Sequence, residues 1–160
     1  MATIAPALPH PTRGGLYGLF ARTAEKALKP SLILLLQRIG IGAVFFQSGR
    51  TKVEGLFTVP QTTFDLFATE YKLPLLDPHT AAYAAATAEH VFPVLLVLGL
   101  FTRASALALL GMTAVIEIFV YPQAWPTHLQ WAAMLLLLLC RGAGRWSADH
   151  WLARVSAAAP

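Results

Sequence analysis

The sequence predicts an all-α integral membrane protein: a four-helix bundle with a short amphipathic helix in its first outer loop. Three observations support this fold class, namely long apolar runs, few charged residues, and basic residues concentrated on one side of the runs. Of the 160 residues, 56% are hydrophobic and 12% are charged. Because soluble domains carry about 25% charged residues, this composition excludes an ordinary soluble domain, a disordered chain and a nucleic-acid-binding module.

Three apolar runs, residues 31–49, 81–100 and 104–121, approach the length that an α-helix needs to cross a bilayer. That length is about 20 residues. A fourth run, residues 129–140, is shorter, and a buried core helix is the alternative interpretation for it. Pro126 at a helix start, with Arg141 and Trp146 as interfacial anchors, extends this run to a fourth span. In the first span, Gly42, Phe46 and Gly49 predict a small-residue seam for close helix packing.

The first outer loop contains its own helical pattern. After Pro60, the aromatic residues Phe64, Phe67 and Tyr71 recur at helical spacing. We therefore expect a short amphipathic helix that lies at the outer interface or plugs the bundle.

The basic residues indicate the orientation, because cytoplasmic loops are enriched in Lys and Arg. With the N-terminus inside, the inner side carries Arg13, Arg22, Lys26, Lys29, Arg103, Arg141, Arg145 and Arg154, and the outer side carries Arg50, Lys52 and Lys72. We therefore expect both termini to be cytoplasmic. The predicted organisation is a basic cytoplasmic N-terminal arm (residues 1–30), a four-span domain (31–152) and a C-terminal tail (153–160).

Polar residues inside the spans are the candidates for function, because a charge at membrane depth costs about 2.5–3.5 kcal/mol and needs a partner. The candidates for an intramembrane polar pocket are Arg38, Arg50, Glu89, His90, Glu117 and His128. Glu117 and His128 fall toward the outer side of the membrane, and Glu89 falls near its midplane. These positions predict a polar chamber that opens outward.

Glu89 is expected to be the most sensitive position. Pro93 has no amide hydrogen, so the carbonyl of Glu89 loses its helical partner at the level of the carboxylate. The expected donors are Arg38, Arg50 and His128, and the sequence does not choose among them. Glu89 and His90 are adjacent, so their side chains point about 100° apart on a helix.

The sequence contains no recognisable catalytic motif of its own. A single cysteine, Cys140, excludes an internal disulfide and a Cys-built metal or iron–sulfur site, and we interpret it as an apolar filler. No flavin-binding or haem-binding motif is present. Metal ligation by His90 with His128, or by Glu89 with Glu117, stays open on geometry alone.

Several short elements occur in a characteristic order. They are Arg38-Ile-Gly40, Phe45, Gly49, Lys52, Leu73-Pro74, Glu89, Leu98-Gly99-Leu100-Phe101-Thr102-Arg103 and the segment 142–149. Over about residues 31–152, this order resembles the DoxX family of small bacterial membrane proteins. The resemblance implies a four-helix protein of the bacterial inner membrane. It also implies relatives that act as membrane subunits of quinone-linked oxidoreductases or as partners of soluble redox enzymes.

Two functional hypotheses follow. In the first, the chain is a membrane subunit of a quinone-linked or otherwise redox-coupled system. Glu89 and Glu117 then move protons or bind a quinone, and Arg38 or Arg50 supplies the opposite charge. In the second, it is a non-catalytic scaffold, an assembly factor or a metal-ion handling protein. The expected partners are the lipid bilayer, a soluble redox enzyme or other membrane subunit, and a second copy in a homo-oligomer, with no nucleic acid.

Overall fold

Helices make up most of the described chain. The structure, a computed structural model, describes residues 15–16, 18–20, 23 and 29–158. Most of the predicted basic arm, including Arg13, Arg22 and Lys26, lies outside the described residues. Residues 1–30 and 31–160 form separate units, and the long helices belong to the second.

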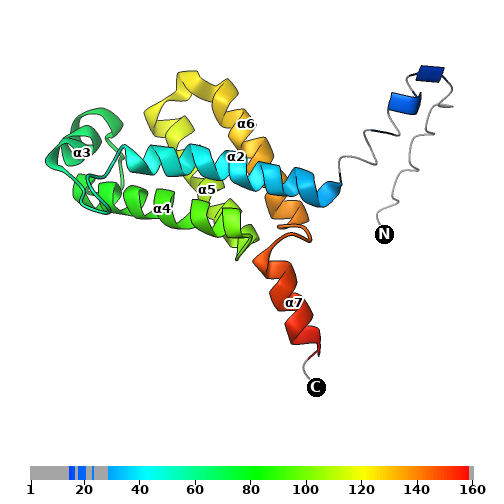
Figure 1. Ribbon diagram of the computed structural model, residues 1–160. Coiled ribbons are helices and arrows are strands. Elements are labelled where there is room, and N and C mark those ends of the chain that lie inside the picture. Colours follow the sequence, from blue (N-terminus) through cyan, green and yellow to red (C-terminus); the bar gives the residue numbers. More distant parts are fainter. Residues whose placement is uncertain (1–14, 17, 21–22, 24–28, 159–160) are drawn as a thin grey trace, which may run out of the picture. The chain divides into compact units, whose positions relative to one another are not determined.

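The described part of the second unit contains six α-helices and three short helical segments of other types (Figure 1). In chain order, the elements are α2 (Pro30–Arg50), α3 (Gln61–Leu66), η1 (Phe67–Tyr71), α4 (Pro78–Leu98), α5 (Thr102–Val115), η2 (Ile116–Val120), η3 (Pro122–Ala124), α6 (Trp125–Arg141) and α7 (Ala148–Ala158). The segments η1 and η2 are π-helical. The described residues form no strand, apart from an isolated bridge between Glu54 and Thr58.

Three of the helices are long and apolar enough to cross a membrane. They are Pro30–Arg50, Pro78–Leu98 and the continuous helix Thr102–Val120. Three of the four predicted spans are therefore confirmed as candidates by length and composition. Helix α6 has 17 residues and is shorter than these three, so the fourth span stays a prediction.

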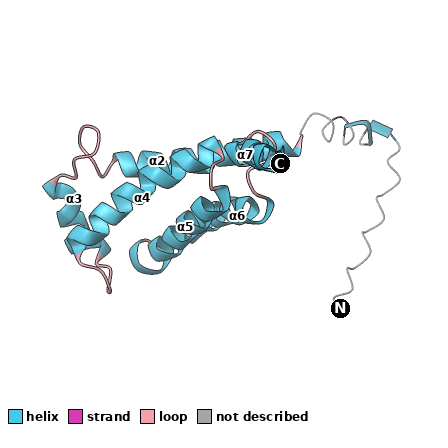
Figure 2. Cartoon of the chain, turned by 90° about the horizontal axis from the view of Figure 1, so that it is seen from below, coloured by secondary structure: helices cyan, strands magenta, loops and turns pink. Residues whose placement is uncertain are grey.

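One apolar core holds α2, α4, α5 and α6 together. Its buried members are Ile41, Phe45, Leu96, Ala106, Leu109, Leu135 and Leu138, which come from all four helices. Many other large apolar side chains are exposed on the helices, as expected where lipid is the solvent. Figure 2 shows α2 beside α4, and α5 beside α6.

The predicted seam of small residues lies between α2 and α4. A Cβ atom at Gly42 would stand 3.1 Å from Val97 Cγ2, and one at Gly49 would stand 2.9 Å from Glu89 Cβ. The two helices therefore approach closely because these glycines have no side chain.

The predicted helix in the first outer loop is confirmed as α3 followed by η1. Phe64 and Phe67 are buried against Ala81 and Ala82 of α4, and Tyr71 packs beside them. This element therefore covers the first turns of α4 with its apolar stripe.

A long-range contact holds the sharp turn between α4 and α5. Helix α4 ends at Gly99, whose positive φ of 69° suits a residue without a side chain. The backbone N–H groups of Phe101 and Thr102 then donate to the carboxylate of Asp149, over 2.8 and 3.0 Å. The first residues of α7 thus cap the first turn of α5, and α7 continues to Ala158, across the boundary predicted at residue 152.

Candidate ligand site

A cavity of about 390 Å³ lies among α2, η1, α4, α5, η2 and α6. Most of its lining is apolar, including Val44, Phe45, Met112, Trp131 and the alanines of α4. The polar side chains that reach it are Ser48, Lys52, Tyr71, Glu89, Tyr121 and His128. The site therefore differs from the expected polar chamber, since it is an apolar cavity with a few polar groups in its lining. This is the usual composition of a small-molecule site.

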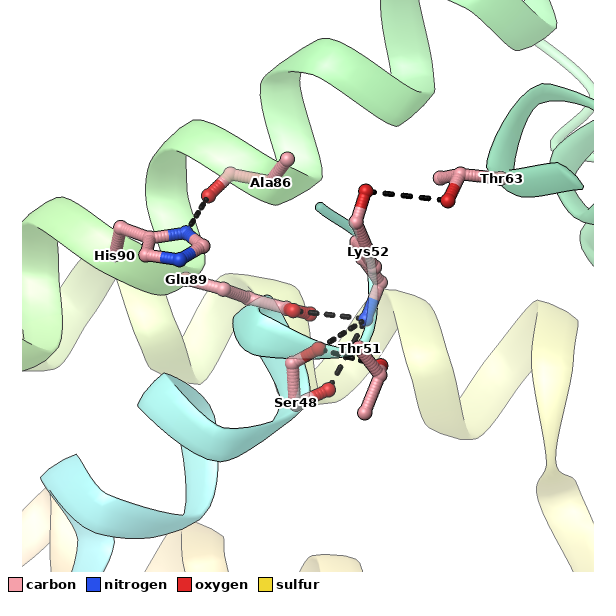
Figure 3. Close-up of polar contacts among 7 residues, drawn as sticks. All are labelled: Ser48, Thr51, Lys52, Thr63, Ala86, Glu89 and His90. Atoms are coloured by element: carbon pink, nitrogen blue, oxygen red, sulfur yellow. Dashed lines mark hydrogen bonds and ion pairs between the residues drawn. The ribbon is translucent and has the colours of Figure 1, made fainter. Parts of the chain in front are cut away.

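Glu89 forms an ion pair with Lys52 in the wall of this cavity. The Lys52 Nζ atom lies 2.8 Å from Glu89 Oε2 and also donates to Ser48 Oγ over 3.0 Å (Figure 3). Both residues are buried, with 2% of Glu89 and 6% of Lys52 exposed. A buried carboxylate thus meets a cation that the sequence analysis did not include among its candidates.

Lys52 reaches Glu89 because the chain turns just beyond α2. The backbone N–H of Lys52 donates to Gly49 O over 3.0 Å, and the Lys52 carbonyl accepts a hydrogen bond from Thr63 Oγ1 over 3.1 Å. The turn is therefore held both by the end of α2 and by α3. The one sequence signal for this residue was its place in the order that resembles the DoxX family.

The arginines expected to pair with Glu89 have other partners. Arg38 is fully buried and donates to the carbonyls of Leu96, Val97 and Trp146. Arg50 is exposed and donates to the carbonyls of Gly55 and Leu56. Neither arginine lines the cavity. The predicted Arg38–Glu89 or Arg50–Glu89 pair is therefore replaced by Lys52–Glu89, and Arg38 instead fastens α2 to the end of α4 and to the 142–147 connection.

His90 points away from Glu89, as the helical spacing predicts (Figure 3). Its Nδ1 atom lies 2.7 Å from the Ala86 carbonyl, which can only accept, so Nδ1 donates. Its Nε2 atom is buried without a hydrogen-bond partner among the described residues. The ring lies between Phe46 and Phe57 and does not line the cavity.

His128 and Glu117 form a second hydrogen-bonded pair at the site. His128 Nδ1 lies 2.6 Å from Glu117 Oε2, and the buried His128 ring lines the cavity. A carboxylate at Nδ1 orients an imidazole and leaves Nε2 for another partner. Glu117 and His128 also line a second, more open cavity of about 310 Å³ beside Leu110 and Leu129. His128 therefore lines both cavities.

Tyr121 and Glu70 join the two π-helical segments where they border the cavity. The Tyr121 hydroxyl donates to Glu70 Oε1, and the Tyr71 and Tyr121 rings are 5.8 Å apart. This hydrogen bond and partial burial raise the pKa of Tyr121. Because π-helical turns occur often at functional sites, their position here agrees with a ligand site. This contact has no signal in the sequence, since nothing local links residues 70 and 121.

Of the metal-ligand pairs that spacing allows, Glu89 and Glu117 each have another partner. Glu89 bonds to Lys52 and Glu117 bonds to His128. Within the part of the chain that the structure describes, no three His, Cys, Asp or Glu side chains are placed to hold a metal ion. The arrangement offers hydrogen-bonding groups to a ligand that is largely apolar.

Comparison with known proteins identifies the family. No curated protein and no solved structure matches the chain. The model of the DoxX family matches residues 33–122, which is 90 of the 160 residues and extends from α2 to the start of η3. The match includes Lys52, Glu89 and Glu117 and ends before His128. On this match, and with its apolar helices, the chain is a membrane protein that belongs to the DoxX family.

Proposed function

We propose that this DoxX protein is a multi-pass inner-membrane subunit of a quinone-linked or otherwise redox-coupled system, with both termini in the cytoplasm. In this proposal α6 is the fourth span, and α2, α4, α5 and α6 form a four-helix bundle around the ligand. The observation that carries the proposal is the apolar cavity lined by one residue pair, Lys52–Glu89, and by the histidine of another, His128–Glu117.

The chemistry of the cavity fits a quinone. A quinone head group is flat and apolar, and its two carbonyl oxygens accept hydrogen bonds. The three N–H groups of Lys52 are directed to Glu89 and Ser48, and Ser48 Oγ, which accepts from Lys52, is a potential donor on one part of the lining. The His128 ring is a potential donor on another part. The cavity volume of about 390 Å³ lies within the range of small-molecule sites, about 300–1,000 Å³.

The residues of the chain would hold protons for such a ligand. When bound, a quinone supplies two-electron chemistry, and its reduction consumes two protons. Glu89 and Glu117 are carboxylates at the cavity and beside it, and each contacts a nitrogen group that also lines the cavity. This places a proton-carrying group near two separate parts of the lining.

The test is whether quinone occupies this cavity. The full chain is purified in mild detergent from quinone-containing membranes, and bound quinone is extracted and quantified. We expect quinone with the wild type. Met112→Trp, which fills the cavity, should lose the quinone. The matched control Leu107→Trp should retain it, because Leu107 is also on α5 but is exposed and lines no described cavity.

The remaining outcomes separate the alternatives. Wild-type protein without quinone, which also fails to bind added ubiquinone or menaquinone, would contradict the proposal and favour a non-catalytic scaffold. If Met112→Trp and the wild type contain the same amount of bound quinone, the quinone binds outside this cavity. Glu89→Gln tests the proton role of Glu89. We expect this variant to bind quinone as the wild type does, and the bound quinone to be reduced more slowly by an added electron donor.

A further inference from the structure

Helix α7 has an apolar stripe that no described part of the chain covers. Trp151, Leu152 and Val155 lie on one face at helical spacing. Their exposed fractions are 65%, 44% and 51%. An exposed apolar stripe on a surface helix predicts contact with a partner or with a membrane surface.

The folded core fixes the position of α7. The Asp149 carboxylate accepts hydrogen bonds from Phe101 and Thr102, and the Asp149 N–H donates to Gly99 O over 2.8 Å. The His150 N–H donates to Ser147 Oγ over 3.2 Å. These contacts set the direction in which α7 leaves the core.

The axis of α7 runs at a steep angle to the axes of α2 and α4. In Figure 1, α7 turns away from α2 and α4, and in Figure 2 the same helix is seen nearly along its own axis. If α2 and α4 cross the bilayer, a helix that runs across their ends lies close to the plane of the membrane. With 11 residues, α7 is also too short to span it.

The charges around α7 are mostly positive. Arg103, Arg141, Arg145 and Arg154 are all exposed in this part of the chain, while the carboxylate of Asp149 is occupied by the amides of α5. Trp146 is exposed as well. Basic residues and tryptophan near the ends of membrane-spanning helices favour binding to an anionic lipid surface.

We infer that α7 is an interfacial anchor that inserts Trp151, Leu152 and Val155 among the anionic head groups of the bilayer in which the protein resides. The apolar stripe supplies insertion, and Arg145 and Arg154 supply attraction to the anionic lipid. Two such signals together hold a short helix on a membrane where one alone is weak. This role is independent of any ligand in the cavity.

Site-directed spin labelling tests the inference with the full chain. In a Cys140→Ser background, single labels are placed on the stripe through Leu152→Cys and Val155→Cys. Matched labels are placed on the opposite face through Ala153→Cys and Ala157→Cys. Each protein is reconstituted alone into phosphatidylcholine vesicles, with or without phosphatidylglycerol, and collisions with oxygen and with a water-soluble nickel complex are measured.

We expect the two stripe labels to collide mainly with oxygen and the two opposite labels mainly with nickel, more clearly when phosphatidylglycerol is present. Arg145→Gln with Arg154→Gln should abolish this dependence on phosphatidylglycerol. If all four labels are accessible to the nickel complex, the stripe is exposed to water and α7 is not an anchor. The stripe would then be available to another protein. Stripe labels shielded from both reagents would also overturn the anchor, since they would indicate a protein contact. Insertion that does not depend on phosphatidylglycerol would overturn the role of anionic lipid.

Discussion

Lys52 and Glu89 are buried charges, and each has the other as its charged partner at 2.8 Å. Removing one member of such a pair costs about 3–5 kcal/mol, because the other charge stays buried without compensation. We expect Lys52→Met to destabilise the protein by about this amount and Glu89→Gln by less, since glutamine can still accept the bond from lysine. The Lys52→Met, Glu89→Gln double variant should recover part of the loss. Thermal unfolding in detergent measures all three.

The same variants test whether Glu89 is the most sensitive position of the chain. Glu89→Gln at normal protein level but without activity would support a proton role. If Glu89→Gln has a normal protein level and normal activity, Glu89 has no proton role. If the Glu89→Gln protein does not accumulate, the Lys52–Glu89 pair is structural. Additive losses in the double variant would show that the two side chains are not coupled.

Cys140 is exposed at the end of α6, and it is the single cysteine in the sequence. We expect Cys140→Ser to leave protein level, thermal stability and quinone content unchanged. A variant that kept its protein level but lost function would require a covalent or thiolate role for this residue.

At the scale of elements, Gly49 controls the distance between α2 and α4. A Cβ atom there would meet Glu89 Cβ at 2.9 Å and the His90 ring at 3.0 Å, which is closer than packed atoms normally approach. We expect Gly49→Ala to lower the unfolding temperature and to reduce bound quinone, because it displaces Glu89 from Lys52. Gly111→Ala is the matched control, since a Cβ at Gly111 meets nothing within 4 Å. Equal effects of the two variants would contradict a specific seam.

The contact between η1 and η2 should depend on pH. Because the pKa of Tyr121 is raised above its ordinary value near 10, the hydrogen bond to Glu70 stabilises the fold below about pH 10. The contribution is lost as the pH rises through the raised pKa. We expect Tyr121→Phe to cost about 1 kcal/mol at neutral pH. Thermal unfolding should show that its difference from wild type shrinks at high pH, whereas Tyr83→Phe, on exposed α4 surface, should show no such trend.

The elements could be predicted from the sequence to different extents. The three long apolar runs predict the three candidate spans directly, because hydropathy and length decide whether a helix can cross a bilayer. The stripe of Phe64, Phe67 and Tyr71 likewise predicts α3 and η1, since spacing alone defines which face is apolar. The π-helical form of η1 and η2 has no comparable signal in the residues.

The candidate site was predicted less completely. Glu89 and His128 were recognised because a polar residue in an apolar run is conspicuous, and both line the cavity. Lys52 was missed as the partner because it lies beyond α2, and its direction depends on how the following turn packs against Thr63. Arg38 was assigned a carboxylate partner, yet its acceptors are mainly backbone carbonyls, which no residue type identifies.

At the scale of the whole molecule, the topology is open to direct test. The distribution of basic residues predicts that both termini are cytoplasmic and that the 122–127 loop lies outside. Reporter fusions after Pro160 and within that loop should be active on opposite sides of the membrane. A C-terminal reporter active only outside the cytoplasm would contradict both the predicted topology and the predicted outward opening of the site.

The contacts of residues 146–149 have a consequence for how the protein is made. Trp146 supplies a carbonyl to the buried Arg38, and Asp149 caps the first amides of α5. Residues 146–149 leave the ribosome after all the apolar helices. Arg38 can therefore reach the carbonyls of Leu96 and Val97 first and gains its third acceptor late, and the first amides of α5 wait for Asp149. Assembly of this end of the bundle is therefore completed only when residues 146–149 have been made. A chain that ends before residue 146 would lack one of the three acceptors of Arg38 and the carboxylate that receives the first amides of α5.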